Sequence, residues 1–333
     1  MKKAFTLIEL LMVIAIIAII STLAVSKVGG VKESSARKVS LANQSAVERA
    51  ISSYMVAGGR LNRLDSLMYA GEGGAPLMGT AAEGDFDFTT TCTPQGREGF
   101  YYGPSAEGTA EVEQMRQEQN SGLMGELTKV MCLYTLSKTQ VDALVNQLGL
   151  RYVMAHTAYA DALQTQFPSI HYPKNRPYGD GTVPNAANGL NPNSSAIIAT
   201  QVTNGMAVAA INPMTDLGRT IYQAMGQELM NTLNWGESYN EADVRAEVKA
   251  KGGPLIAFGL GDSCSAIGKA NAGLETAPYA TYPQRRFYTR YILLFRLKTA
   301  GEGSVSVVIP EFAGVLDCCG NTIRAAEQII RTL

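Results

Sequence analysis

An excess of charge of either sign is missing from this 333-residue chain, whose 28 Lys and Arg and 29 Asp and Glu leave a formal net charge of −1. Proteins that bind nucleic acid through bulk charge carry a basic excess, so nucleic acid is not an expected partner. Histidine is scarce, with only His156 and His171, and neither these nor the five cysteines show metal-ligand spacing. The patterns G-x-S-x-G, H-E-x-x-H and the P-loop are absent. We therefore expect no catalytic residues, no metal centre and no cofactor, and a protein that is not an enzyme.

Two stretches come close to a ligand-binding pattern. Residues 259–268 (GLGDSCSAIG) place glycines after an expected strand, but G-x-G-x-x-G fails because Ser263 and Cys264 follow Gly261, which indicates a glycine-rich turn. Residues 285–296 interleave four arginines with aromatic side chains, an arrangement that can bind DNA strands. A strand with a solvated polar face explains the second pattern more simply.

The chain is rich in apolar residues at its start. Phe5 to Val25 consists almost entirely of Leu, Ile, Val, Ala, Met and Phe. A helix of about twenty residues spans about 30 Å, the thickness of a hydrocarbon core, so this run predicts a transmembrane helix. Lys2 and Lys3 form a positive flank that stays cytoplasmic, which places the rest of the chain on the outer side. Glu9 is the one acid in the run, and an ionisable group in a membrane span is a functional candidate.

Ala4 followed by FTLIELLMVIAIIAII resembles the N-terminus of type IV pilins and of the pseudopilins of type II secretion systems. The resemblance implies that prepilin peptidase cuts between Ala4 and Phe5 and that the new N-terminal Phe5 is methylated. It also implies that Glu9, the fifth residue after the cut, pairs with a Phe5 ammonium, its own or a neighbour's, as helices stack into a filament. Opposite charges in a low dielectric cost less together than apart. Ala4 departs from the glycine that the family usually has at this position.

The function implied by this resemblance is that of a structural subunit of a type IV pilus or a type II secretion pseudopilus. The implied partners are other pilin or pseudopilin subunits, prepilin peptidase, an inner-membrane assembly platform and membrane lipid. The implied location is the inner membrane, crossed once with a periplasmic head, and then a filament in the periplasm or at the cell surface. The alternative is a membrane-tethered binding module or adhesin, similar to a minor pilin, whose head captures a ligand or a surface.

The N-terminal helix is expected to continue past the membrane. Apolar residues recur at spacings of three and four, which predicts one apolar helix face: Val39, Ala42, Ala46, Val47, Ala50, Ile51 and Tyr54. Gly58 and Gly59 predict its end. The expected organisation is a leader at 1–4, a pilin helix at 5–57 with its transmembrane part at 5–25, and a head at 58–333. Gly29 and Gly30 interrupt the helix at a cost of about 2 kcal/mol relative to alanines, and either soften or kink it.

The predicted fold class is α+β, with the long N-terminal helix packed on a small antiparallel sheet and a large helical and loop insertion at about 108–252. A capping box at Ser137 to Gln140 predicts a helix that stops at Gly149. Further helices are expected at 123–136, 151–167, 215–235, 241–251 and 321–333. Strands are expected in part of 86–91 and, at the C-terminal end of the head (about 255–312), at 255–260, 285–297 and 304–310, the last two as an antiparallel hairpin.

Two further predictions concern the head. Because the cysteines lie in an oxidising compartment, we favour a disulfide from Cys264 to Cys318 or Cys319, with buried free thiols as the alternative. Residues 168–195 are rich in Pro, Asn and Gly, which predicts an exposed loop. Its side chains that can offer oxygens to Ca²⁺ are Asp180, Asn185, Asn188 and Asn191. The twelve-residue acidic loop pattern of a calcium site is absent.

Overall fold

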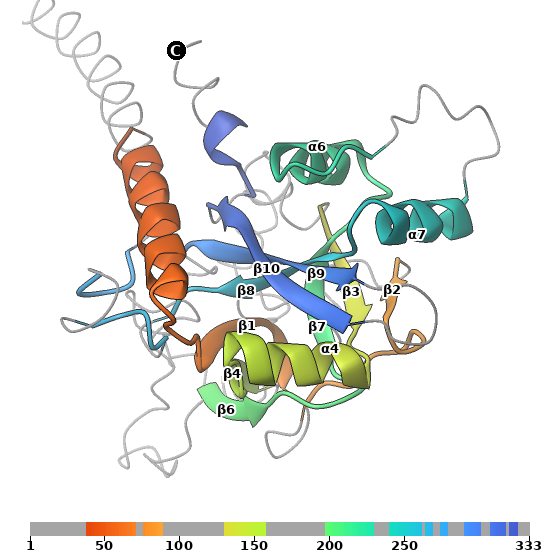
Figure 1. The fold of residues 1–333 in the computed structure, drawn as a ribbon, viewed down its shortest axis with the longest axis horizontal. Helices are drawn as coiled ribbons and strands as arrows, with labels where there is room; N and C mark the ends of the chain where they lie inside the picture. Colours follow the sequence, from red (N-terminus) through yellow and green to blue (C-terminus); the bar gives the residue numbers. More distant parts are fainter. Residues whose placement is uncertain are drawn as a thin grey trace, which may run out of the picture.

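A computed structural model describes residues 38–70, 76–88, 130–157, 197–229, 240–261, 264–268, 274–278, 290–300, 307–317 and 320–325. These ranges form a mixed sheet with helices packed around it, which confirms the predicted α+β class. Figure 1 shows the N-terminal helix, drawn in red-orange, along one end of the sheet. The chain's motif residues Ala4, Phe5 and Glu9 lie outside the described ranges.

The sheet divides at strand β8 (Leu255–Gly259), whose five residues are all buried. One edge of β8 pairs along its whole length with β9 (Ile292–Ala300). The other edge pairs near its start with β7 (Ala207–Ile211) and at its end with β1 (Arg63–Ala70). A continuous apolar run such as LIAFG suits a strand that is buried on both faces.

Two branches of the sheet extend from β7 and β1 on this side of β8, and we call β8 the fork of the sheet. From β7 the sheet continues antiparallel to β3 (Met131–Thr135) and then to β2 (Asp85–Asp87). From β1 it continues parallel to β4 (Tyr152–Thr157) and antiparallel to β6 (Ile197–Gln201). The prediction of a small antiparallel sheet is therefore wrong, because the described residues alone contribute nine strands, and β1 pairs with β4 in parallel.

The C-terminal strands were predicted well. β8 covers the expected strand at 255–260, and β9 pairs antiparallel with β10 (Val307–Leu316), which confirms the hairpin. The hairpin register shifts between Phe312 and Gly314, where one extra residue bulges out of β10. β2 overlaps the start of the partial strand expected at 86–91 and begins one residue before it.

In the described part of the head, α4 (Lys138–Ala143) continues directly into the π-helix η2 (Leu144–Leu148). The backbone N–H of Ser137 donates to Gln140 Oε1 over 2.9 Å, as a capping box requires, and Gly149 ends the helix with a φ of 83°. α6 (Asp216–Ala224) and α7 (Glu241–Ala250) lie within the expected helices at 215–235 and 241–251.

Two expected helices are wrong in their described parts. The stretch 123–136 contains strand β3, and the stretch 151–167 contains strand β4. Short apolar runs fit a buried strand and a buried helix equally well by periodicity, and MCLYT is buried at every position. The region 108–252 accordingly contributes β3, β4, β6 and β7 in addition to helices, so the prediction of a helical and loop insertion is wrong for this part of the chain.

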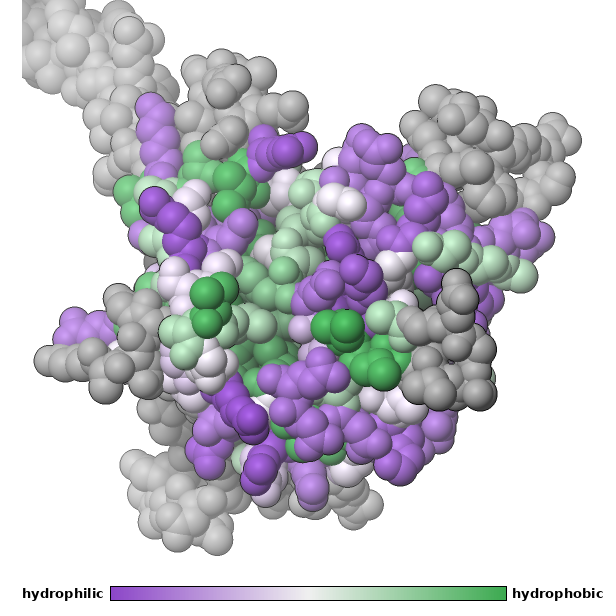
Figure 2. Space-filling model, in the orientation of Figure 1, coloured by the Kyte–Doolittle hydropathy of each residue, from purple (hydrophilic) through white to green (hydrophobic). Residues whose placement is uncertain are grey.

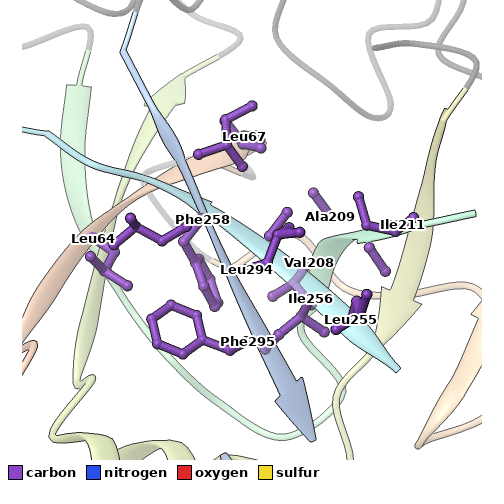
Figure 3. Close-up of a cluster of buried hydrophobic side chains, with 14 of the residues drawn as sticks. Leu64, Leu67, Val208, Ala209, Ile211, Leu255, Ile256, Phe258, Leu294 and Phe295 are labelled. Atoms are coloured by element: carbon purple, nitrogen blue, oxygen red, sulfur yellow. The ribbon is translucent and has the colours of Figure 1, made fainter. Parts of the chain in front are cut away.

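The core lies where the strands cross at the fork. Figure 3 shows Leu64 of β1, Val208 of β7, Phe258 of β8 and Phe295 of β9 converging there. The ring centroids of Phe258 and Phe295 lie 6.3 Å apart, and the ring of Phe312 of β10 contacts that of Phe295 in a tilted arrangement, with 5.7 Å between centroids. Burial of each such side chain is worth about 1.5–3 kcal/mol, so this cluster is a main source of stability.

We predict that Gly253→Ala destabilises the head more than Gly226→Ala does. Both glycines have a left-handed backbone, with φ of 95° and 78°. A Cβ at Gly253 would lie 2.1 Å from the carbonyl oxygen of Leu297, whereas a Cβ at Gly226 would meet nothing within 4 Å. Gly226→Ala should cost about 1–2 kcal/mol, and Gly253→Ala clearly more, in urea unfolding. Equal losses would contradict the prediction.

Candidate functional site

The head positions that were singled out from the sequence are only partly described. The turn at 259–268 is present, with Cys264 N–H donating to Gly261 O and Ile267 N–H to Cys264 O. Cys264 is buried and forms no disulfide with another described residue, and burial raises the pKa of its thiol to about 12. Its proposed partners Cys318 and Cys319 lie outside the described residues, as does the loop at 168–195, so the disulfide and the Ca²⁺ site stay predictions.

Arginines of the 285–296 segment are engaged within the protein where they are described. Arg290 is 3% exposed, and Arg296 donates to the carbonyl oxygen of Met225 and lies 3.9 Å from Glu311. Lys298, two residues on, reaches the same Glu311 carboxylate at 3.5 Å. Figure 2 shows hydrophilic side chains mixed with hydrophobic ones over the side of the molecule that it presents. The described residues 290–297 are all buried except the partly buried Arg296, so the solvated strand face favoured from the sequence is wrong here, and the described arginines do not form an exposed DNA-binding strip either.

The described part of the N-terminal helix covers residues 38–56 and is followed by a turn at Gly58, whose φ is 83°. The N–H of Gly59 donates to Tyr54 O over 2.9 Å, so the predicted stop at Gly58 and Gly59 is confirmed. The inward face of this helix consists of residues spaced by four, three and four positions, all buried: Ser40, Gln44, Val47 and Ile51.

The opposite, outward face of the helix is exposed. It consists of Val39, Ala42, Ala46, Arg49, Ser53 and Val56. Val39 is 60% exposed and Val56 is 89% exposed, although both are apolar. The prediction of a single apolar face is therefore wrong, because the apolar residues divide between the two faces: Val47 and Ile51 point inward, and Val39, Ala42 and Ala46 point outward.

Buried hydrogen bonds join the inward face to the head at two levels. Tyr291 Oη donates to Ser40 O over 2.7 Å and lies 3.2 Å from Ser40 Oγ. Gln44 Nε2 donates to Val315 O over 2.8 Å and to Asn321 O over 3.0 Å. We call Tyr291, Val315 and Asn321 the seat of the helix.

The loop that carries Asn321 is itself braced. The Asp317 carboxylate accepts from the backbone N–H of Asn321 over 2.8 Å and from its Nδ2 over 2.9 Å. Asp317 N–H donates back to Asn321 O over 3.1 Å. Asp317 is 6% exposed, so these bonds also satisfy a buried carboxylate. The acceptor offered to Gln44 is thus held in place from behind.

Glu48 lies at the flank of the same helix, next to the bulge of β10. A Cβ at Gly314 would approach Met225 Sδ to 2.6 Å and Glu48 Oε2 to 3.9 Å, so the helix, β10 and the end of α6 come close together here. Partial burial raises the pKa of Glu48 from its ordinary value of 4.5. Among the described residues it has no hydrogen-bond or ion-pair partner.

Within the described ranges, no three His, Cys, Asp or Glu side chains come together in a group that could hold a metal ion. Nor is any helix of that part of the chain long and apolar enough to cross a bilayer, and the apolar run at 5–25 lies outside it. What the described residues offer is a packing surface: a helix held by its inward face on the head, with its outward face open.

Comparison with protein families identifies residues 1–25 as the prokaryotic N-terminal methylation motif. This is the prepilin-type signal of type IV pilins and pseudopilins, which confirms the resemblance drawn from the sequence. The match covers this N-terminal signal alone, and residues 26–333 lie outside it. Neither the curated proteins nor the solved structures contain a match to the chain.

We predict that Glu48→Gln removes a pH-dependent loss of stability. Because the pKa of Glu48 is raised in the folded chain, its contribution to the free energy of unfolding is complete below pH 4.5 and is lost as the pH rises through the raised pKa. At pH 7 the variant should be more stable by less than about 1 kcal/mol, since solvent still reaches the group. Urea unfolding of both chains from pH 4 to 7 tests this, and identical pH profiles would contradict it.

Proposed function

We propose that the chain is a structural subunit of a type IV pilus or of a type II secretion pseudopilus. The observation that supports this proposal is the methylation motif at residues 1–25. Prepilin peptidase would cut between Ala4 and Phe5, and Phe5 would be methylated. The processed chain would stay in the inner membrane through residues 5–25 until it enters a filament with other subunits.

Glu9 has a defined physical role in this proposal. A single carboxylate in an apolar run is costly in hydrocarbon, by about 2.5–3.5 kcal/mol at a helix centre on insertion scales. A Phe5 ammonium, created by the cleavage, offers an opposite charge within the same apolar surroundings. Pairing of the two groups between neighbouring subunits would favour one axial offset between their helices, because other offsets leave the charges apart.

The division of the helix 38–56 into two faces supports the same proposal. A helix that only linked the head to a membrane anchor would gain nothing from exposed apolar side chains on its outward face. Val39, Ala42 and Ala46 are small or medium apolar residues on consecutive turns, so a neighbouring helix could approach closely along them. The head is then carried outside the helical packing.

The first prediction from this proposal concerns processing. Mass spectrometry of the native N-terminal peptide should find a peptide that begins at methylated Phe5, in the membrane fraction and in material sheared from cells. The presence of this peptide in sheared material requires both cleavage and export. A peptide that still starts at Met1 and stays in the membrane fraction would sink the filament proposal.

The second prediction concerns Glu9. Glu9→Ala should abolish filament yield while membrane insertion stays intact, because removing one partner of a buried ion pair costs about 3–5 kcal/mol at every subunit contact. Thr6→Ala, which changes an uncharged polar residue of the same segment, is the matched control and should assemble. Filament yield is compared by shearing and immunoblotting at equal membrane content. Normal yield from Glu9→Ala would rule out this role for the carboxylate.

A further inference from the structure

Apolar contacts alone do not determine which face of helix 38–56 lies against the head. The helix carries apolar side chains on both faces, Val47 and Ile51 inward and Val39, Ala42 and Ala46 outward. Hydrophobic attraction is non-directional and follows the area buried. A helix turned about its axis, or shifted by one turn, would therefore bury a different apolar set with a moderate loss.

The polar residues of the inward face do distinguish these arrangements. Gln44 is 1% exposed, and its amide donates to two backbone carbonyls, Val315 O at 2.8 Å and Asn321 O at 3.0 Å. Turning or sliding the helix would take the amide away from both acceptors and leave the buried Val315 carbonyl without this donor, whereas Asn321 O would keep Asp317 N–H. Losing these buried bonds is far more costly than a poor apolar contact. A buried amide in a coiled coil selects register by the same mechanism.

Tyr291 supplies a second point four residues away along the helix. Its side chain is fully buried, and its hydroxyl donates to Ser40 O over 2.7 Å. Tyr291 itself is fixed to the centre of the sheet, because its carbonyl accepts from Leu260 N–H over 2.9 Å directly after β8. Two separated hydrogen-bonding points constrain rotation and axial position together, whereas one point would leave a pivot.

We propose that Gln44 and Tyr291 form a polar clamp that sets the rotation and axial position of the N-terminal helix on the head. They would thus be positioning residues that keep Val39, Ala42 and Ala46 turned outward for a neighbouring subunit. The use of the outward face rests on the proposed function, but the clamp itself does not. Since all three seat residues come from the last part of the chain, the clamp closes only when β9, β10 and the loop after β10 are in place.

The test reads which face of the helix is closed in the full-length chain. Ser40→Cys, on the inward face, and Ala42→Cys, on the outward face, serve as reporters, and maleimide labelling of each is followed on its own peptide by mass spectrometry. In the otherwise native chain, the Ser40→Cys reporter should label far more slowly than the Ala42→Cys reporter. Adding Gln44→Met, which keeps the side-chain length and removes the amide, should raise labelling at position 40 by about tenfold or more.

Gln147→Met is the matched control. Gln147 Nε2 donates to Val308 O over 2.8 Å, so it makes the same type of bond to the opposite end of β10 without touching the helix. Labelling at position 40 should not change in this variant, even if the melting temperature falls. Tyr291→Phe, which keeps the buried ring, is the second test variant and should act like Gln44→Met.

Unchanged labelling at position 40 in both Gln44→Met and Tyr291→Phe would overturn the clamp. An equal rise in Gln147→Met would also overturn it, because the effect would then be general destabilisation of the head. Filament yield separates the two proposals. If Glu9→Ala assembles normally while Gln44→Met opens the inward face, the proposed assembly mechanism fails and the clamp stands.

Discussion

The double pairing of β8 is the constraint on which the rest of the structure depends. Five consecutive buried residues, Leu255 to Gly259, are hydrogen-bonded on both edges and packed on both faces. This strand orders β9 directly, and through β9 it orders β10. Tyr291 and Val315, which hold the N-terminal helix, belong to these two strands or their immediate ends. The position of the helix is therefore set from the centre of the sheet outward.

This dependence joins the two ends of the chain. Within the part of the chain that the structure describes, the buried side-chain hydrogen bonds that tie helix 38–56 to the head go to Tyr291, Val315 and Asn321, so they form only once these distant residues are folded. Long-range contacts of this kind form late, since the intervening loop must be closed first. For the proposed filament subunit, this order would keep a chain with an unfolded head from packing against its neighbours. A chain whose head is incomplete has no fixed outward face to offer to its neighbours.

Sequence reasoning succeeded where a local pattern has one physical meaning. The resemblance of residues 1–25 to the prepilin-type signal, the capping box at Ser137, and the β9–β10 hairpin are of this kind. It failed at β3, because MCLYT is apolar throughout and no period distinguishes a buried strand from a helix. It also merged the two faces of the N-terminal helix. Val47 and Ala46 are both apolar and both fit helical spacing. Which of them is buried depends on the side of the helix that carries Gln44, whose acceptors at Val315 and Asn321 are far away in sequence.

The two parts of the chain answer to different physical requirements. In the proposed function, residues 1–25, which carry the methylation motif, have to fit a peptidase, a membrane and neighbouring helices, so the loss of Glu9 would affect several partners at once. The head has to hold one helix, and two hydrogen-bonding side chains with a few apolar contacts are enough for that. A sheet larger than the small one predicted from the sequence is therefore compatible with holding the helix by its inward face. In the proposed subunit, the helix face presented to neighbours depends on the last strands of the head, because these strands and the loop after them carry the seat.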